Sequence, residues 1–425
     1  MSPVMLELTD ERRQALAGLV RAWATQRQAV AGDHVPVVVR EAEVLRPGRP
    51  GILDVLAEID GAMAHAVLGV RRPGEEQRLL RPREEGVLGL IEDDDGTGMV
   101  IDAMGDADLA PLVLAAVTGG SGEVTVAAVR DDDEAVTVAF GDRCSLTVFP
   151  WVFSGPHPGV ELLVGLDEAG FNHLAAPLAV WRRGGRDLGV VQEWVVGAAD
   201  GWAIALTSLR DLYARGGAPE DAGGDFGPEA VALGTMAARM HLALERAFGR
   251  RPGNVWTWAD EIERQVAALY PALLEDAGVL GTLASARAAD PAAPALRTHG
   301  DLHLGRTART DHGWIVADTM PGGRPLGVGE PRFRSPLADV ADVLWSLHHV
   351  SSVAAGERDP TGRAGLQSLG QAWEARNRRA FLSGYLGTPG IHALVPEDRG
   401  AVRDLVALFE LERAVARLAA SPSGG

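Results

Sequence analysis

Lysine is missing from this chain of 425 residues: all 40 of its basic residues are arginine, against 58 aspartate and glutamate residues. The alanine-, glycine- and arginine-rich composition is typical of a GC-rich genome, which depletes lysine codons. A site that needs a permanent side-chain cation must therefore use arginine. A long guanidinium is not a direct replacement for a compact ammonium group.

Cysteine is almost as scarce, because Cys144 is the single one. A single cysteine excludes a disulfide framework or a thiolate metal cluster within one chain. No run of about 18 uninterrupted apolar residues occurs, as a membrane-spanning helix would need. Residues 1–7 also lack the basic and then apolar pattern of a signal peptide. We therefore expect a cytoplasmic protein without a membrane span.

The net charge of -18 limits the partners that the surface can attract. It repels phosphate backbones and argues against nucleic acid or an anionic membrane as a partner. The composition is easier to reconcile with a small-molecule ligand that is neutral or cationic.

The clearest motif is Thr298-His-Gly-Asp-Leu-His-Leu-Gly-Arg306, followed by a turn at 311–313 and an apolar run that ends at Asp318. Two carboxylates so arranged, Asp301 and Asp318, are typical of a kinase-like catalytic hairpin. There the first accepts the proton of the substrate hydroxyl and the second holds magnesium against the phosphates of ATP. The alternative is a surface loop with a capping aspartate, since such residues are common in turns.

The chain resembles the aminoglycoside-phosphotransferase-like kinases and, among them, the actinobacterial maltokinases and glucosamine kinases. Besides the hairpin, the resemblance rests on the segments 155–161, 191–202, 238–242, 335–340 and 373–385. It implies an α+β, bilobal protein-kinase-like fold with an N-terminal maltokinase-type cap.

Composition and hydrophobic period divide the chain into three parts. Residues 1–104 are predicted to form the cap, with one helix at 6–28 and short strands. Residues 105–195 are predicted to form a strand-rich N-lobe, with a degenerate nucleotide-binding site. Residues 196–425 show the helical period of a C-lobe that carries the hairpin. Helices are expected at 158–168, 203–213, 229–248, 256–277, 337–353, 370–386 and 397–420.

The nucleotide side departs from the family pattern. The loop that cradles phosphate in the family reads Asp131, Asp132, Asp133 and Glu134, and the sequence leaves open whether it faces the cleft. The position of the phosphate-binding lysine falls on Thr147, and its acidic partner on Glu161. Glu193 lies in the run that resembles the hinge beside the adenine.

The metal side departs as well. Asp318 keeps the position of the magnesium carboxylate, but the amide ligand five positions after Asp301 is replaced by Arg306. A guanidinium cannot bind a cation. The second acid of the usual Asp-Phe-Glu-Gly motif is replaced by Met320.

These departures favour a repurposed protein that has lost ATP-dependent phosphotransfer and needs no cofactor. As an enzyme, it would use Asp301 and His303 as acid and base on a small molecule in the inter-lobe cleft, with Arg306 pairing an anionic group. As a pseudokinase, it would bind a partner enzyme. The alternative is an active kinase that uses ATP and magnesium to phosphorylate a sugar, an aminosugar or a related hydroxylated metabolite.

Overall fold

The structure is a computed structural model, and it describes residues 4–27, 35–75, 77–80, 86–93, 95–120, 124–131, 135–221, 224–320, 333–356 and 363–420. The chain forms two compact units. The first comprises Met1–Glu161, Ala176–Val196 and Met320–Glu330, and the second comprises Leu162–Ala175, Gly197–Thr319 and Pro331–Gly425.

The first unit begins with a seven-stranded antiparallel sheet in the order β1-β2-β3-β4-β6-β5, with β10 paired to β4. Its strands are β1 (Val4–Met5), β2 (Val37–Arg46), β3 (Gly51–Ile59), β4 (Ala62–Arg71), β5 (Val87–Asp93), β6 (Gly96–Asp102) and β10 (Trp151–Val152). Helix α1 (Asp10–Gln26) packs on the sheet through Leu16, Val20 and Trp23, which are buried at the spacing of one helix face. The short η1 (Ala103–Gly105) and α2 (Ala110–Thr118) follow.

A second antiparallel sheet in this unit has the order β11-β12-β9-β8-β7. Its strands are β7 (Val126–Asp131), β8 (Val136–Phe140), β9 (Cys144–Val148), β11 (Pro177–Arg183) and β12 (Arg186–Glu193). The turn between β8 and β9 has Gly141 at a φ of 58°, a conformation that glycine adopts without strain. Helix α3 (Pro158–Glu168) follows β10 and has the bounds that the sequence predicts.

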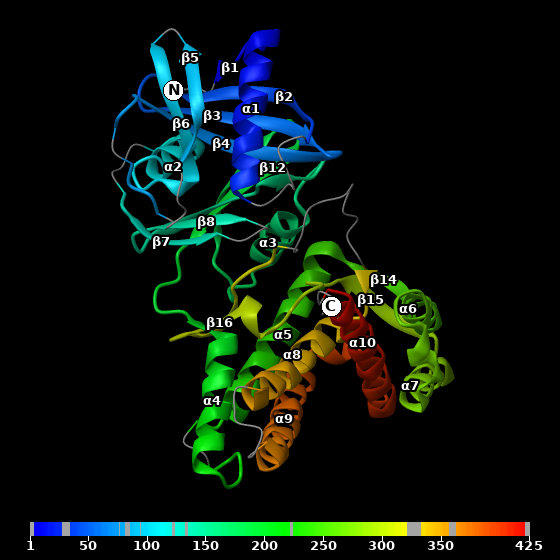
Figure 1. The fold of residues 1–425 in the computed structure, drawn as a ribbon. Coiled ribbons are helices and arrows are strands. Elements are labelled where there is room, and N and C mark those ends of the chain that lie inside the picture. The colour runs from blue at the N-terminus through cyan, green and yellow to red at the C-terminus, as the bar shows by residue number, and fades with distance from the viewer. Residues whose placement is uncertain are drawn as a thin grey trace. The chain divides into compact units, whose positions relative to one another are not determined.

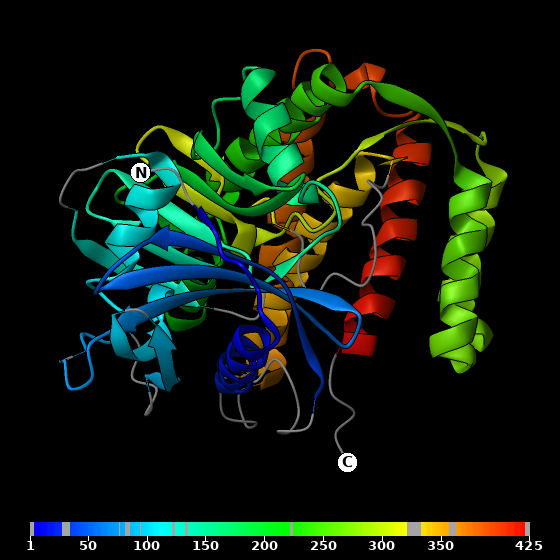
Figure 2. The same ribbon diagram turned by 90° about the horizontal axis from the view of Figure 1, so that it is seen from above.

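The second unit is mainly helical. Its helices are α4 (Gly201–Arg215), α5 (Gly227–Phe248), α6 (Val255–Leu269), α7 (Ala277–Ala288), α8 (Leu337–Gly356), α9 (Arg363–Leu386) and α10 (Arg399–Ala420), with the short η2 (Pro271–Glu275), η3 (Leu304–Arg306) and η5 (Ile391–Ala393). Figures 1 and 2 show α10 between α8 on one side and α6 and α7 on the other.

Two small sheets complete this unit. One joins β13 (Ala199–Asp200), β16 (Thr307–Thr310) and β17 (Gly313–Val316), and the other joins β14 (Arg250–Asn254), β15 (Ala292–Arg297) and β18 (Phe333–Arg334). The hairpin β16–β17 confirms the predicted turn at 311–313. It places Asp318 two residues beyond the end of a strand.

Helices α5 and α9 approach each other closely because glycine lies at their contact. A Cβ atom added at Gly234 would lie 2.1 Å from the carbonyl oxygen of Phe381, and one at Gly384 would lie 2.0 Å from that of Val231. Any larger residue at either position would push the two backbones apart.

Some predicted elements need correction. The single helix predicted at 256–277 is two helices, because α6 ends before Pro271, whose ring and missing N–H cannot continue it. Several elements were not predicted, among them the strands β3, β6, β11, β14 and β15 and the helices α2 and α7. The predicted boundary at 104/105 falls inside the first unit, and the one at 195/196 falls next to the passage into the second unit. The three-part division itself stays a prediction.

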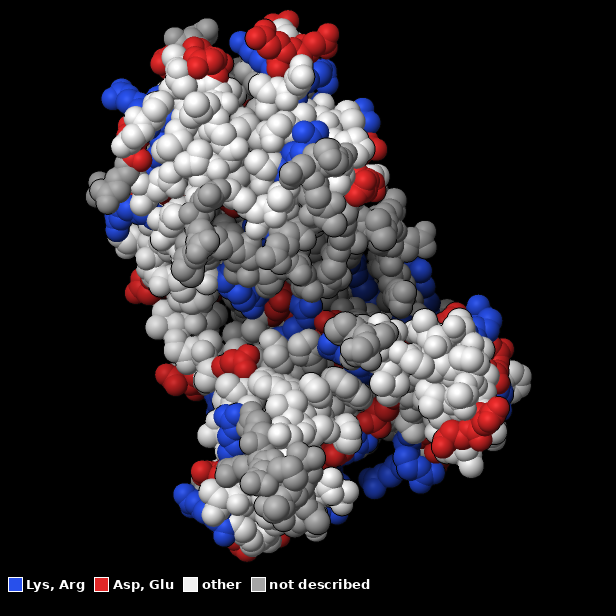
Figure 3. Space-filling view, in the orientation of Figure 1, with Lys and Arg blue, Asp and Glu red and all other residues white. Residues whose placement is uncertain are grey.

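On the face of each unit that Figure 3 shows, arginine and acidic side chains lie interspersed. Within the described parts of the chain, no helix is long and apolar enough to cross a membrane.

Candidate functional site

The loop that carries Asp301 is held by a buried carboxylate at the start of α8. Asp339 is fully buried and accepts hydrogen bonds of 2.8 Å from the backbone N–H groups of both His299 and Gly300. Gly300 has a φ of 83°, which the absence of a Cβ permits. The imidazole Nε2 of His241 lies 3.0 Å from the same carboxylate, and its Nδ1 lies 2.8 Å from the hydroxyl of Tyr385.

His299 connects the two carboxylate-bearing segments. Its Nε2 lies 2.8 Å from the carbonyl oxygen of Asp318, and its Nδ1 lies 3.4 Å from the backbone N of Asp301. Burial lowers the pKa of the imidazole, although Asp339 and the Asp318 carbonyl oppose that shift. A neutral ring that donates from Nε2 and accepts at Nδ1 satisfies both contacts. His299 thus fixes the spacing of Asp301 and Asp318 through the backbone.

Arg306 lies between the two carboxylates. Its Nε donates to Asp301 Oδ2 at 2.9 Å and its Nη1 donates to Asp318 Oδ2 at 2.7 Å. The side chain is only 9 % exposed, and η3 fixes its backbone through a hydrogen bond to the carbonyl of His303. Charge-assisted hydrogen bonds of this length are among the stronger polar contacts in proteins.

Helix α10 brings two further arginines to the same place. Arg413 Nη2 donates to Asp301 Oδ1 at 2.5 Å, and its Nε lies 3.4 Å from Asp342 Oδ1. Arg417, one turn later, has its Nη2 4.0 Å from Asp301 Oδ1. Three guanidinium groups therefore surround one carboxylate.

The titration of the acids follows from these neighbours. Burial would raise the pKa of Asp301, but the nearby His303, Arg306 and Arg413 outweigh it and hold the pKa far below its ordinary value. Burial raises the pKa of Asp342 well above its ordinary value, and Arg413 opposes that shift only in part. Asp301 thus stays ionised at neutral pH, whereas Asp342 holds its proton to a higher pH than an ordinary aspartate does.

A magnesium ion does not fit these side chains as they are arranged. Each of the two candidate ligands, Asp301 and Asp318, has an oxygen engaged by the guanidinium of Arg306. In the part of the chain that the structure describes, no group of three or more His, Cys, Asp or Glu residues could hold a metal ion. Met320, in place of a second acid, is buried and offers no oxygen.

The positions that the resemblance gives to the nucleotide lie in the second sheet and in α3. Thr147 on β9 is buried, and its hydroxyl lies 3.0 Å from that of Thr137 on β8. Glu161 on α3 lies in the field of Arg182, whose direct partner is Asp187. Glu193 is exposed at the end of β12. Of the acidic loop 131–134, whose orientation toward the cleft the sequence leaves open, Asp131 ends β7 and residues 132–134 lie outside the described residues.

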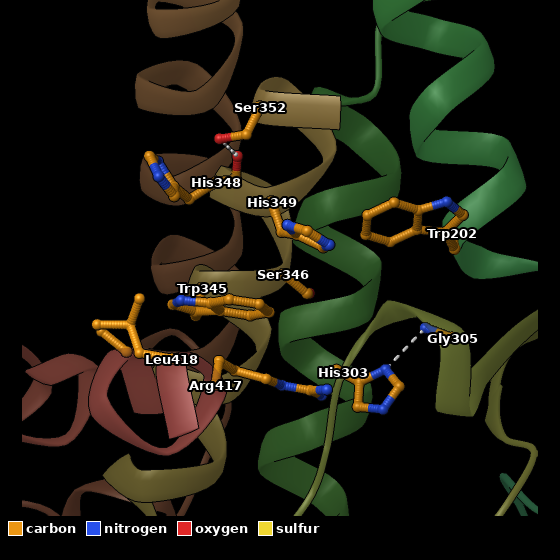
Figure 4. A pocket seen from close by; sticks show the side chains of 11 residues that line it. Trp202, His303, Gly305, Trp345, Ser346, His348, His349, Ser352, Arg417 and Leu418 are labelled. Carbon is orange, nitrogen blue, oxygen red and sulfur yellow. Dashed lines mark hydrogen bonds between the residues drawn. The ribbon is translucent and has the colours of Figure 1, made fainter. Parts of the chain in front are cut away.

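A cavity of about 730 Å³ opens beside this loop, entirely within the second unit. Figure 4 shows the ring of Trp345 between His349 and Arg417, with His303 and Trp202 across the cavity. The rings of Trp345 and His349 stack at 4.9 Å between centroids, and Arg417 lies over the Trp345 ring at 5.3 Å. His303 and Gly305, from the loop of Asp301, form part of the lining.

Asp301, His303, Arg306 and Asp318, which the sequence places in one site, lie together in the structure. His303 is the most loosely connected, with its Nε2 3.7 Å from Asp301 Oδ2. The chemical roles predicted for these residues stay predictions.

Sequence reasoning missed Arg413, Arg417 and Trp345. The two arginines are four positions apart on a predicted helix, a spacing that puts them on one face and could have marked them. Nothing in the sequence shows that this face meets Asp301.

Comparison with known proteins relates part of the chain to a glucosamine kinase. No family model matches the chain. A glucosamine kinase of Mycolicibacterium smegmatis (strain ATCC 700084 / mc(2)155) is 31% identical over 242 residues, which is 51% of this chain and 57% of that enzyme. The chain is thus related to this kinase over about half of the relative's length.

Two solved structures agree over most of the chain. A glucosamine kinase in complex with glucosamine, ADP and inorganic phosphate superposes with a TM-score of 0.62, at 20% identity, over 94% of this chain and 93% of that one. Crystal form A of a glucosamine kinase gives the same TM-score at 21% identity, over 96% and 94%. These likenesses confirm the predicted α+β kinase-like fold.

Proposed function

We propose that this chain is a sugar kinase that transfers a phosphoryl group from ATP to a hydroxyl of a sugar or a related hydroxylated metabolite. The relationship to a glucosamine kinase supports this alternative over the loss of phosphotransfer that the sequence departures favoured. The observation that carries the proposal is the position of Asp301. The loop that bears it also supplies His303 and Gly305 to the lining of the cavity.

In the proposed reaction, the bond between the γ-phosphorus and the β–γ bridging oxygen of ATP breaks and a new bond joins that phosphorus to the sugar oxygen. The hydroxyl proton goes to Asp301, and ADP leaves. Such transfers depend mainly on positioning and charge stabilisation. Asp301 is a weak base here, because its pKa is held low. It would orient the hydroxyl first and take the proton late. In a chain without lysine, Arg306 is the cation proposed to face the developing charge.

A second candidate function is supported by Arg306 itself. Its hydrogen bonds to Asp301 and Asp318 take up the oxygens with which a kinase would hold magnesium. A protein built this way would bind a small molecule or a partner enzyme without phosphorylating anything. Acid and base chemistry by Asp301 and His303 would then be the remaining catalytic possibility.

An assay of ADP release separates the two candidate functions. ADP release is measured with a panel of sugars and ATP, with magnesium and with a chelator, for the wild type, Arg306→Asn and Asp301→Asn. A sugar kinase shows sugar-dependent ADP release that Asp301→Asn lowers by about 100-fold or more.

The second candidate gives a different result. The wild type then releases no ADP with any sugar, and Arg306→Asn, which supplies an amide ligand, binds ATP only when magnesium is present. Calorimetric titration with ATP measures that gain. A wild type that is inactive under all conditions would overturn the kinase proposal.

A further inference from the structure

The lining of the cavity beside Asp301 differs in charge from the chain as a whole. Although the sequence has a net charge of -18, none of the described residues that line this cavity is acidic. The lining includes Arg417 and three histidines, His303, His348 and His349. The local potential is therefore decided by a few side chains and not by the composition.

The acids near the cavity lie behind its lining and have partners there. Arg306, Arg413 and Arg417 face Asp301, Asp318 and Asp342, and Glu374 lies 3.0 Å from Nδ1 of His348. Arg417 is the arginine that lines the cavity itself, and its side chain is 43 % exposed.

The rest of the lining suits a ring with an apolar face. Trp202 on α4 supplies aromatic surface, while the ring of Trp345 on α8 lies between His349 and Arg417 (Figure 4). The His349 ring lies at centroid distances of 5.2 Å from Trp202 and 4.9 Å from Trp345. Ser346 and Ser352 add hydroxyl groups. Aromatic walls with a few placed polar groups are typical of sites for small polyhydroxylated ligands.

We propose that this cavity binds an anionic sugar, a pyranose that carries a carboxylate or a phosphate, in preference to a neutral sugar or an aminosugar. The guanidinium of Arg417 pairs with the anionic group, since planar guanidinium groups match carboxylates and phosphates with two parallel hydrogen bonds. The ring packs among Trp202, Trp345 and His349. An ammonium group on the ligand would meet Arg417 and no carboxylate in the lining. The inference rests on the proposed function only in taking a sugar as the ligand.

The test is calorimetric titration of the full chain without nucleotide. The probes are glucuronate, glucose 6-phosphate, glucose, glucosamine and inorganic phosphate. We expect both anionic sugars to bind about tenfold or more tightly than glucose, and glucosamine to bind most weakly, because a hydrogen bond between charged groups adds affinity of that order. A preference for only one of the two anionic sugars identifies the anionic group as carboxylate or phosphate.

Two variants probe the role of Arg417. Arg417→Gln should remove the preference, so that the anionic sugars bind no more tightly than glucose does to the same variant. Arg417→Glu should reverse the preference, so that glucosamine binds more tightly than to the wild type. A gain of affinity cannot result from misfolding. Arg403→Gln serves as the matched control, because Arg403 lies on the same helix with its side chain 78 % exposed, next to Asp404.

Several results would overturn the inference: glucosamine binding to the wild type as tightly as glucuronate and glucose 6-phosphate, inorganic phosphate alone binding as tightly as glucose 6-phosphate, or an unchanged preference in Arg417→Glu. The kinase proposal fails separately, through a lack of ADP release. Anionic sugars that bind without being phosphorylated would contradict that proposal and support this one.

Discussion

Arg413, near the end of α10, donates a hydrogen bond of 2.5 Å to the carboxylate of Asp301, which lies 112 positions earlier in the sequence. This contact joins the last helix to the loop with the candidate catalytic carboxylate. Both side chains are largely buried, with exposed fractions of 13 % and 26 %. The last helix is therefore part of the site, and its charge affects how Asp301 titrates.

Replacing Arg413 by glutamine should lower the free energy of unfolding at pH 7 by about 1.5 to 3 kcal/mol, the usual contribution of a hydrogen bond to a charged group. Urea denaturation measures the change. Because the pKa of Asp301 is lowered on folding, its stabilising effect is present above the pKa of the unfolded chain, near 3.8, and is lost as the pH falls from there through the folded pKa. The folded pKa lies far below 3.8, so Asp301 is still ionised and paired at pH 3, and the loss caused by Arg413→Gln should be nearly the same at pH 7 and pH 3. Arg403→Gln, in an exposed pair with Asp404, should change the free energy of unfolding little. A loss that disappears at pH 3 would contradict this account.

Asp342→Asn should stabilise the protein at neutral pH. Burial raises the pKa of Asp342, so the folded state holds this proton to a higher pH than the unfolded chain does. The protonated carboxyl group makes its full contribution to the free energy of unfolding below about pH 3.8, and this contribution is lost as the pH rises through the folded pKa. Asparagine does not titrate and so avoids this loss. The free energy of unfolding should therefore increase by about 1 kcal/mol at pH 7 and stay unchanged at pH 3. Urea denaturation at both pH values checks it, and a destabilised variant at pH 7 would show that the contact with Arg413 outweighs burial.

His299→Gln should flatten the stability of the protein between about pH 6.5 and 5. The pKa of His299 is lowered on folding from an ordinary value of 6.5, so the unfolded chain binds the proton more readily. Stability therefore rises with pH and is lost as the pH falls below 6.5. The midpoint of thermal unfolding at pH 8, 6.5 and 5 measures this slope. If the slope of the variant equals that of the wild type, another group causes it.

Gly384→Ala should destabilise the second unit by about 1 to 3 kcal/mol, because the new Cβ would lie 2.0 Å from a backbone carbonyl of α5 and the helices must separate. Gly281→Ala on α7 is the matched control. No atom lies within 4 Å of its added Cβ, so the better helix propensity of alanine should stabilise the protein by up to about 1 kcal/mol. Chemical denaturation of the two variants should give changes of opposite sign.

Most of the helices and some of the strands could be predicted, because hydrophobic period and turn residues act over a few positions. Helix α3 and the hairpin β16–β17 agree with the expected ranges. The break at Pro271 was missed, because the apolar period continues across it. The strands β3 and β11 were missed as well, since neither was singled out from its neighbours by the pattern of apolar residues.

The sequence by itself determined which side chains are available: no lysine, Asp301 and Asp318 at the spacing of a kinase hairpin, and an arginine where an amide ligand is expected. Only the tertiary structure decided what those side chains do to one another. Arg306 engages both carboxylates, α10 adds Arg413 and Arg417, and burial raises the pKa of Asp342. The physical reason is that pairing, burial and charge balance depend on distances between segments far apart in the chain, which local patterns do not contain.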